Sequence, residues 1–228
     1  MHTSTSLSIK VIKAPDPALR IQTRPVKKIT PSLLSTFKEM VKLTKSFKDP
    51  EGVGLASTQI GLDEQYFVAK VDGSERTRKQ AGDTTHLAGG VENQSGSHLR
   101  GVLNSEVGKP AASAKGFGEP KEKFITVINP KITWTSKKVK KYFEGCLSIP
   151  NYWGEVERFI GIKVTYQDET GKQVNANLKG VMAWIFQHEI DHLSGKLFVD
   201  RVLEQKGKFY KNAGKDKTGT DIFEEISI

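Results

Sequence analysis

Apolar residues recur at helical spacing in two stretches of the chain. The first stretch follows Thr30 and Pro31, where a residue suited to the N-cap precedes a proline at the first helical position, and we expect this helix to end before Asp49. The second runs from about 181 to 193 and ends at Gly195, a residue typical of helix C-caps. Each pattern predicts an amphipathic helix with one face buried in a core.

Shorter runs of β-branched and aromatic residues predict strands. They lie at 9–13, 65–71, 124–130, 132–136, 138–145, 162–167 and 173–178. The last two flank the turn-forming sequence DETGK and predict a β-hairpin, whereas the residues between CLSIP and 162 are expected to form a loop. Because strands predominate and helices are few, the predicted fold class is α+β.

The composition changes between about 72 and 122. These residues are rich in Gly, Ser, Lys, Glu and Asn, and they show neither the helical nor the strand period. A structureless segment of this length is unusual within a compact domain. The sequence therefore predicts a single domain over 1–228 that contains a flexible insertion, and we expect His86 and His98 in it to be exposed loop histidines.

The overall composition is that of a soluble globular protein, with 36% hydrophobic and 27% charged residues. No apolar run approaches the roughly 20 residues that span a bilayer, so no membrane partner is expected. The N-terminus lacks the apolar stretch of a secretory signal, and the one cysteine, Cys146, excludes an internal disulfide. A reducing compartment such as the cytoplasm is therefore expected.

Positive charge exceeds negative charge by nine, and it concentrates at 135–141 and in a basic tail that begins at about 201. A basic surface can bind nucleic acid or a ribosome. Solvated lysines that keep the protein soluble are the simpler interpretation. The non-enzymatic alternative is an RNA- or ribosome-binding module that a metal ion stabilises. Such a module would function without Glu189, the glutamate of the metal-binding motif that follows here.

Candidate chemistry lies on the second predicted helix, in the sequence QHEIDH. His188 and His192 are four residues apart, so both imidazoles project from one helical face and can reach one metal ion. Glu189 completes an HExxH motif, the signature of zinc hydrolases. Two ligands do not complete a tetrahedral site. An endopeptidase of the zincin type would take its third ligand downstream, yet no histidine follows His192.

Cys146 is the leading candidate for the third ligand. It follows Gly145 at the end of a predicted strand, where the backbone can bring a side chain close to a helix. Two histidines and one cysteine leave an open position for water, which is the arrangement of a catalytic rather than a structural zinc site. A buried structural cysteine is the competing interpretation, because free cysteine packs as a small hydrophobic residue.

Three segments, 51–61 (EGVGLASTQIG), 144–150 (EGCLSIP) and 187–195 (QHEIDHLSG), resemble the three motifs of the peptide deformylase family in form and order. The resemblance extends to 9–20, 128–130 and 197–200. It implies an α+β fold in which mostly antiparallel strands pack around a metal-bearing helix in the C-terminal half. It also implies removal of the formyl group from the formyl-methionine of nascent polypeptides, with release of formate.

The resemblance assigns roles by matching position. Cys146, His188 and His192 would hold the metal, and Glu189 would be the general acid and base. The Gln59 side-chain amide and the Leu147 backbone N–H would form the oxyanion hole. The residues that would bind the substrate are Val53, Gly54, Glu144, Gly145, Val181, Trp184 and Ile185, with Gly54 against the substrate backbone and the apolar side chains and the stem of Glu144 around the methionine.

The family typically works with ferrous iron, and zinc, nickel or cobalt can replace it. A thiolate ligand suits such softer or redox-active ions. The expected partner is a nascent formyl-methionyl polypeptide, and the basic surface could contact the ribosome. We expect a monomer in a cytoplasm of the bacterial type, with an organelle as the alternative.

The chain departs from the family pattern at two positions. Ser57 stands where the family usually has a second alanine, and its hydroxyl could add a hydrogen bond beside the oxyanion hole. Trp184 is bulkier than the usual aliphatic residue, so it either narrows the methionine pocket or packs in the core. Arg158 matches an arginine that pairs with the motif aspartate, here Asp191; an exposed arginine is the alternative.

Overall fold

The structure is a computed structural model that describes residues 9–71 and 123–227. The predicted insertion at about 72–122, with His86 and His98, lies outside the described residues and stays a prediction, as does the single-domain organisation. In the part of the chain that the structure describes, no helix is long and apolar enough to cross a membrane.

The first sheet has five strands in the order β1-β2-β3-β6-β7. Their bounds are β1 (Gly54–Ala56), β2 (Tyr66–Val71), β3 (Lys123–Thr135), β6 (Gly161–Gln167) and β7 (Gln173–Lys179). The pairs β1–β2, β3–β6 and β6–β7 are antiparallel. The predicted hairpin at 162–178 is therefore confirmed as β6–β7.

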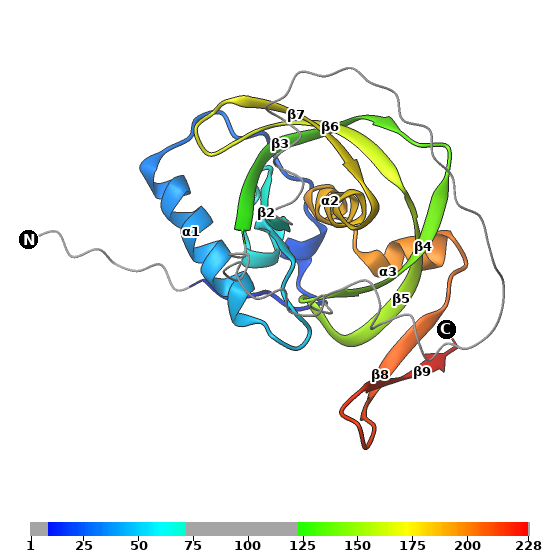
Figure 1. Ribbon diagram of the computed structural model, residues 1–228. Coiled ribbons are helices and arrows are strands. Elements are labelled where there is room, and N and C mark those ends of the chain that lie inside the picture. Colours follow the sequence, from blue (N-terminus) through cyan, green and yellow to red (C-terminus); the bar gives the residue numbers. More distant parts are fainter. Residues whose placement is uncertain (1–8, 72–122, 228) are drawn as a thin grey trace, which may run out of the picture. The chain divides into compact units, whose positions relative to one another are not determined.

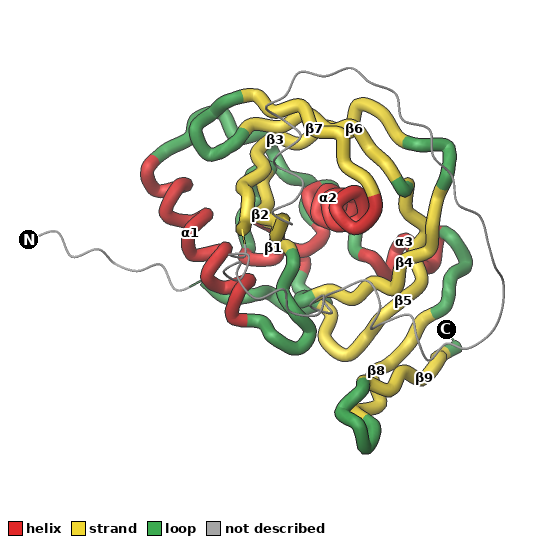
Figure 2. Tube along the Cα trace, viewed as in Figure 1, coloured by secondary structure: helices red, strands yellow, loops and turns green. Residues whose placement is uncertain are grey.

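The second sheet has four strands in the order β4-β5-β8-β9. It consists of β4 (Val139–Cys146), β5 (Ile149–Phe159), β8 (Phe209–Lys215) and β9 (Asp221–Ile226). All its pairs are antiparallel. β4 and β5 are joined by a tight turn in which Cys146 pairs with Ile149. Figure 2 shows strands of both sheets around the helix α2.

The helices are α1 (Pro31–Ser46), α2 (Gly180–Leu193) and α3 (Phe198–Glu204), with short 3-10 helices at Pro17–Arg20 and Ser57–Ile60. α1 begins as predicted, because the Thr30 hydroxyl accepts the Leu33 N–H at 3.2 Å and proline occupies the first position. α2 ends close to the predicted Gly195, whose φ is +70°. The predicted α+β class is confirmed.

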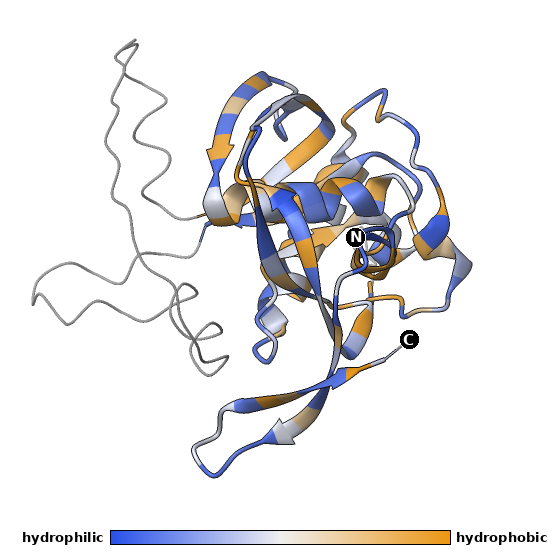
Figure 3. Ribbon diagram, turned by 90° about the vertical axis from the view of Figure 1, so that its right-hand side faces the viewer, coloured by the Kyte–Doolittle hydropathy of each residue, from blue (hydrophilic) through white to orange (hydrophobic). Residues whose placement is uncertain are grey.

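α2 lies at the centre of the largest apolar cluster. Figure 1 shows it end-on with the strands around it. Phe186 is fully buried and meets Phe67 of β2 edge-to-face, with ring centroids 5.1 Å apart. A second cluster joins α1 to β2 through residues that include Phe37 and Tyr66. Apolar and polar residues alternate along the strands in Figure 3, as expected where one face of a sheet is buried.

Two local predictions were wrong. Residues 9–13 form no strand; instead the Ile12 N–H donates to the Gln59 carbonyl at 2.8 Å, and the Ala14 N–H donates to the Ser148 carbonyl at 2.9 Å. The expected loop after CLSIP is the strand β5. Its inward positions include Gly154 and the buried Arg158, so the apolar alternation that marks a strand is broken.

Three further features differ from the sequence prediction. β3 is continuous across the two strands predicted at 124–136, with a register shift between Ile128 and Lys131. The basic tail from 201 contains most of α3 and the β8–β9 hairpin, neither of which was predicted. The glycines and lysines of the tail interrupt the alternation of apolar and polar residues by which a strand is recognised. Such an alternation is needed less in strands at the end of a sheet, where β8 is followed only by the edge strand β9.

Phe186→Ala should lower the free energy of unfolding by about 3–5 kcal/mol, because it leaves a cavity where Phe67 now packs. Leu203→Ala is the matched control, since Leu203 on α3 is 57% exposed and its truncation should change stability by less than about 0.5 kcal/mol. Urea denaturation measures both values. Equal, small losses would contradict a core centred on α2.

Candidate metal centre

Three potential ligands converge from two elements. Cys146 is the last residue of β4, and His188 and His192 lie one turn apart on α2. Their donor atoms all lie within 4.8 Å of one another, and Cys146 Sγ is 3.2 Å from His192 Nε2. The packing of α2 in the core therefore brings the two predicted histidines to the predicted cysteine.

The chemistry of this donor set fits one divalent metal ion. Sulfur and two imidazole nitrogens leave an open position in a tetrahedral arrangement. Burial raises the pKa of the Cys146 thiol, but the neighbouring His192 and His188 outweigh burial and hold that pKa well below its usual range, which favours the thiolate. Within the described residues, Glu189 Oε2 is buried and has no hydrogen-bond partner, as expected beside a site for water or substrate.

Glu144 orients His188 from behind. His188 Nδ1 lies 2.9 Å from Glu144 Oε2, so Nδ1 donates to the carboxylate and Nε2 is left for a metal. Both Glu144 oxygens also accept from Arg158, at 2.7 and 2.9 Å. The Glu144 side chain is 0% exposed. The Glu144 carboxylate thus contacts Arg158 and the ligand histidine, and the expectation that the stem of this side chain lines the methionine pocket stays a prediction.

Asp191 extends the same network. Arg158 donates to it at 2.5 Å, and Arg201 of α3 donates at 2.6 and 2.9 Å. The predicted pair between Arg158 and Asp191 is confirmed, and the exposed-arginine alternative is wrong, because the Arg158 side chain is only 4% exposed. Sequence reasoning missed Arg201, which it counted in the basic tail. The arginines lock the α2 segment that carries both histidines.

Glu189 lies beside the backbone of β1. A Cβ added at Gly54 would lie 2.3 Å from Glu189 Oε1, so any larger residue there would displace the Glu189 carboxylate. Burial raises the pKa of Glu189 to about 7, against the lowering effect of the nearby histidines. A carboxyl group with a pKa near neutrality can both accept and donate a proton.

Gln59 points its amide nitrogen at the candidate ligand. Its Oε1 accepts the Ala56 N–H at 2.8 Å, which fixes the orientation of the amide, and its Nε2 lies 3.3 Å from Cys146 Sγ. The same nitrogen donates to Ser148 Oγ at 3.2 Å. Leu147 lies between Cys146 and Ser148 in the β4–β5 turn. The structure thus places both predicted oxyanion-hole residues next to Cys146, and Ser148 is an added partner.

The apolar residues predicted to hold the methionine gather around α2. Val53, Val181 and Trp184 pack against the core cluster that contains Ile185. The Trp184 ring stacks on Tyr142 of β4, with centroids 5.2 Å apart and planes at 9°. These contacts make Trp184 a packing residue of the β4–α2 interface. That the four residues form a methionine pocket stays a prediction.

Ser57 does not serve the oxyanion hole as expected. Its hydroxyl donates to the Glu64 carbonyl at 2.5 Å, within the connection between β1 and β2. Gly145 has a packing reason of its own, because a Cβ there would lie 2.8 Å from the Trp153 ring. The Ser57 hydroxyl therefore belongs to the β1–β2 connection, and the lack of a side chain at Gly145 leaves room for the Trp153 ring.

The fold and the site define a class: a metal-dependent hydrolase whose HExxH helix is surrounded by antiparallel sheets and whose third ligand comes from an upstream strand. The polypeptide deformylase family model matches residues 8–208. The chain belongs to the peptide deformylase family.

Individual relatives are similar over most of the chain. It is 32% identical to a peptide deformylase of Bartonella tribocorum over 91% of this chain and 94% of that protein. It is 33% identical to a peptide deformylase of Brucella suis, covering 88% of each. Among solved structures, the Thermotoga maritima peptide deformylase covers 85% of this chain and 96% of its own, with a TM-score of 0.59 and 29% identity. A Synechococcus elongatus peptide deformylase in complex with actinonin has a TM-score of 0.60 and 26% identity, covering 88% and 81%.

Glu144→Gln should weaken metal binding about 10- to 100-fold, because a neutral amide orients and polarises His188 less well than a carboxylate. Glu155→Gln is the matched control, since Glu155 pairs with Lys141 on the exposed side of the same sheet. A chelator-competition titration measures both affinities. Unchanged affinity in Glu144→Gln would contradict the orienting role.

Proposed function

We propose that this chain removes the formyl group from the N-terminal formyl-methionine of nascent polypeptides and releases formate. The observation that carries this function is the meeting of three motifs at one point: Gln59 from the first, Cys146 from the second, and the histidine pair with Glu189 from the third. A third ligand from upstream also argues against the endopeptidase alternative.

Cys146, His188 and His192 would hold one divalent ion, and we propose ferrous iron as the native one. Zinc, nickel or cobalt could occupy the same donors, because thiolate and imidazole ligands suit all of these ions. When bound, the ion supplies Lewis acidity and lowers the pKa of its water toward neutrality.

Glu189 moves the proton. It takes a proton from the attacking water and gives it to the amine nitrogen as the C–N bond breaks, which leaves formate and a free N-terminus. The Gln59 amide nitrogen and the Leu147 backbone N–H donate to the formyl oxygen as negative charge develops there. The Ala56 N–H fixes the orientation of the Gln59 amide, and its Nε2 exchanges the contact with Ser148 Oγ for one with the formyl oxygen.

The substrate backbone would bind as an added strand. Among residues 9–71 and 123–227, β1 ends the first sheet and β4 ends the second, so both present backbone groups at an edge. The peptide would pair with the backbone at Gly54 of β1 and at Gly145 of β4. The methionine side chain would then meet Val53, Val181, Trp184 and Ile185.

The partner we propose is a nascent chain as it leaves the ribosome. Lysines of the β3–β4 turn, such as Lys137 and Lys138, are exposed and could contact ribosomal RNA through their charge. We further propose that the chain acts as a monomer in the cytoplasm, with an organelle of bacterial descent as the alternative compartment.

Glu189→Ala should reduce formate release from formyl-Met-Ala-Ser by about 10²- to 10⁴-fold while the metal stays bound, because the proton carrier is lost and the ligands are not. The measurement uses anaerobically purified protein loaded with ferrous iron or nickel. Glu204→Ala, which removes an exposed glutamate of α3, is the matched control and should retain full turnover.

Cys146→Ser adds a second arm to this assay, since it should lose both metal and turnover. The proposed function fails if metal-loaded wild-type protein releases no formate. Full activity in Glu189→Ala would leave the function standing but remove Glu189 from it.

A further inference from the structure

A cleft of about 350 Å³ is lined by Cys146 and Leu147 and by residues of the C-terminal hairpin. Cys146 and Leu147 line one end of it. The wall then follows the start of β5, with Tyr152 and Trp153, and Asn212, Lys215 and Asp221 of the β8–β9 hairpin complete it. Cys146, a proposed metal ligand, and Leu147, a proposed oxyanion-hole residue, therefore share one cleft with the hairpin.

The hairpin lies beyond the part of the chain that matches the family model. That match ends at residue 208, and β8 begins at Phe209. The matched region thus accounts for the catalytic motifs and for one side of the cleft, but not for the wall that β8–β9 adds.

The base of the hairpin is firmly attached. β8 continues the second sheet, with Trp153 opposite Tyr210 and Gly154 opposite Phe209. Aromatic rings cover the junction: Phe143 stacks on Trp153 with centroids 5.4 Å apart, and Phe223 of β9 meets both rings at 5.0 and 5.5 Å. The hairpin is therefore held in place by the strands that carry the second motif.

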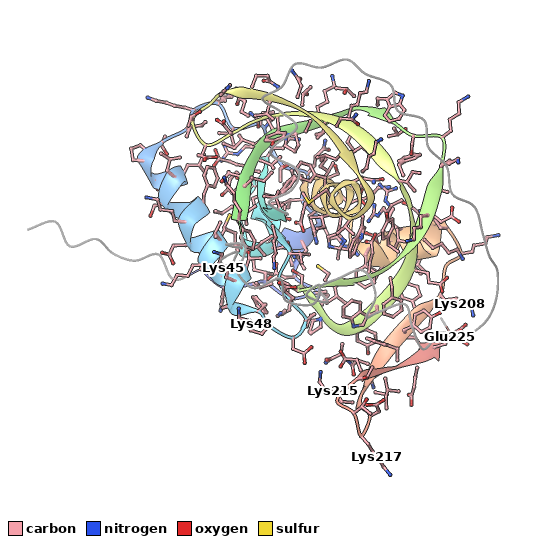
Figure 4. The ribbon with its side chains drawn as sticks, viewed as in Figure 1. Lys45, Lys48, Lys208, Lys215, Lys217 and Glu225 are labelled. Atoms are coloured by element: carbon pink, nitrogen blue, oxygen red, sulfur yellow. The ribbon has the colours of Figure 1, made fainter. Side chains whose placement is uncertain are left out.

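The far end of the hairpin is bridged across the cleft. Lys215 Nζ lies 2.7 Å from Asp49, in the segment between α1 and β1, and 3.3 Å from Asp221 on β9. Figure 4 shows Lys215 on the hairpin and Lys217 at its tip, with Lys208 and Glu225 at the base. Both Asp49 and Lys215 line the cleft, so this bridge closes one side of it.

We propose that the β8–β9 hairpin forms a subsite for the peptide residues that follow the formyl-methionine. The inference rests on the proposed function, which places the formyl group at Cys146 and Leu147, so that later residues extend along the cleft. The lining suits an extended peptide, because the exposed Tyr152 ring offers a packing surface and the charges of Lys215 and Asp221 offer hydrogen bonds. Lys215 sets the width and charge of this subsite.

Lys215→Glu tests the subsite through substrate length. The change leaves Asp49 and Asp221 without their cation and adds a third negative charge, so we expect kcat/KM for formyl-Met-Ala-Ser-Ala-Ala to fall about five- to tenfold, mainly through KM. The value for formyl-Met-Ala should stay within about twofold, since a dipeptide leaves the hairpin empty. Lys217→Glu is the matched control: it makes the same charge change outside the cleft lining and should alter neither value.

An equal loss for both substrates, or no loss for either, would overturn the subsite while leaving the proposed function intact. No formate from the wild-type protein with any peptide would overturn the proposed function, and this inference with it.

A second measurement needs no variant of the enzyme. A formyl-methionyl pentapeptide that carries a benzophenone side chain at its third or fourth residue should, on irradiation of the metal-loaded protein, crosslink to residues 209–221. The same group at the second residue should label the β4–β5 turn. Crosslinks that never reach the hairpin from any position would refute the subsite.

Discussion

The position of the metal centre depends on one buried set of ion pairs. Glu144 and Asp191 carry negative charge where water is excluded, and Arg158 lies between them with 4% of its side chain exposed. Charges buried in this way are tolerated only when every partner is present, and removal of one partner from such a pair typically costs about 3–5 kcal/mol. The network therefore fixes the strands β4 and β5 and the helix α2 relative to one another.

The effect of this ion-pair network on the metal centre follows from the two-residue period of a strand and the 3.6-residue period of a helix. Glu144 and Cys146 are two residues apart on β4, so both side chains point to the α2 side of the sheet. His188, Asp191 and His192 lie within about one turn of α2. When the arginine pairs with both carboxylates, the thiol is brought to the imidazoles. The ion pairs and the donor set are thus two parts of one contact between strand and helix.

Much of this could be predicted from sequence, because the strongest local patterns coincide with the chemistry. The HExxH spacing is itself a helical feature, and Gly195, with φ of +70°, follows the end of α2. β5 could not be predicted, since it turns Arg158 inward, and a buried arginine looks like a surface residue until its two carboxylates are placed. Arg201 and the β8–β9 hairpin could not be predicted for a related reason. The partners of Arg201, Lys215 and Phe223 lie on other segments of the chain and meet these residues only in the folded chain.

The central claim is that one sulfur and two imidazole nitrogens of this chain bind a single metal ion. X-ray absorption spectroscopy at the zinc edge of zinc-loaded protein tests it directly. The account predicts one sulfur scatterer at about 2.3 Å and two imidazole nitrogens at about 2.0–2.1 Å, with the sulfur lost in Cys146→Ser. A first shell of nitrogen and oxygen alone in the wild-type protein would contradict it.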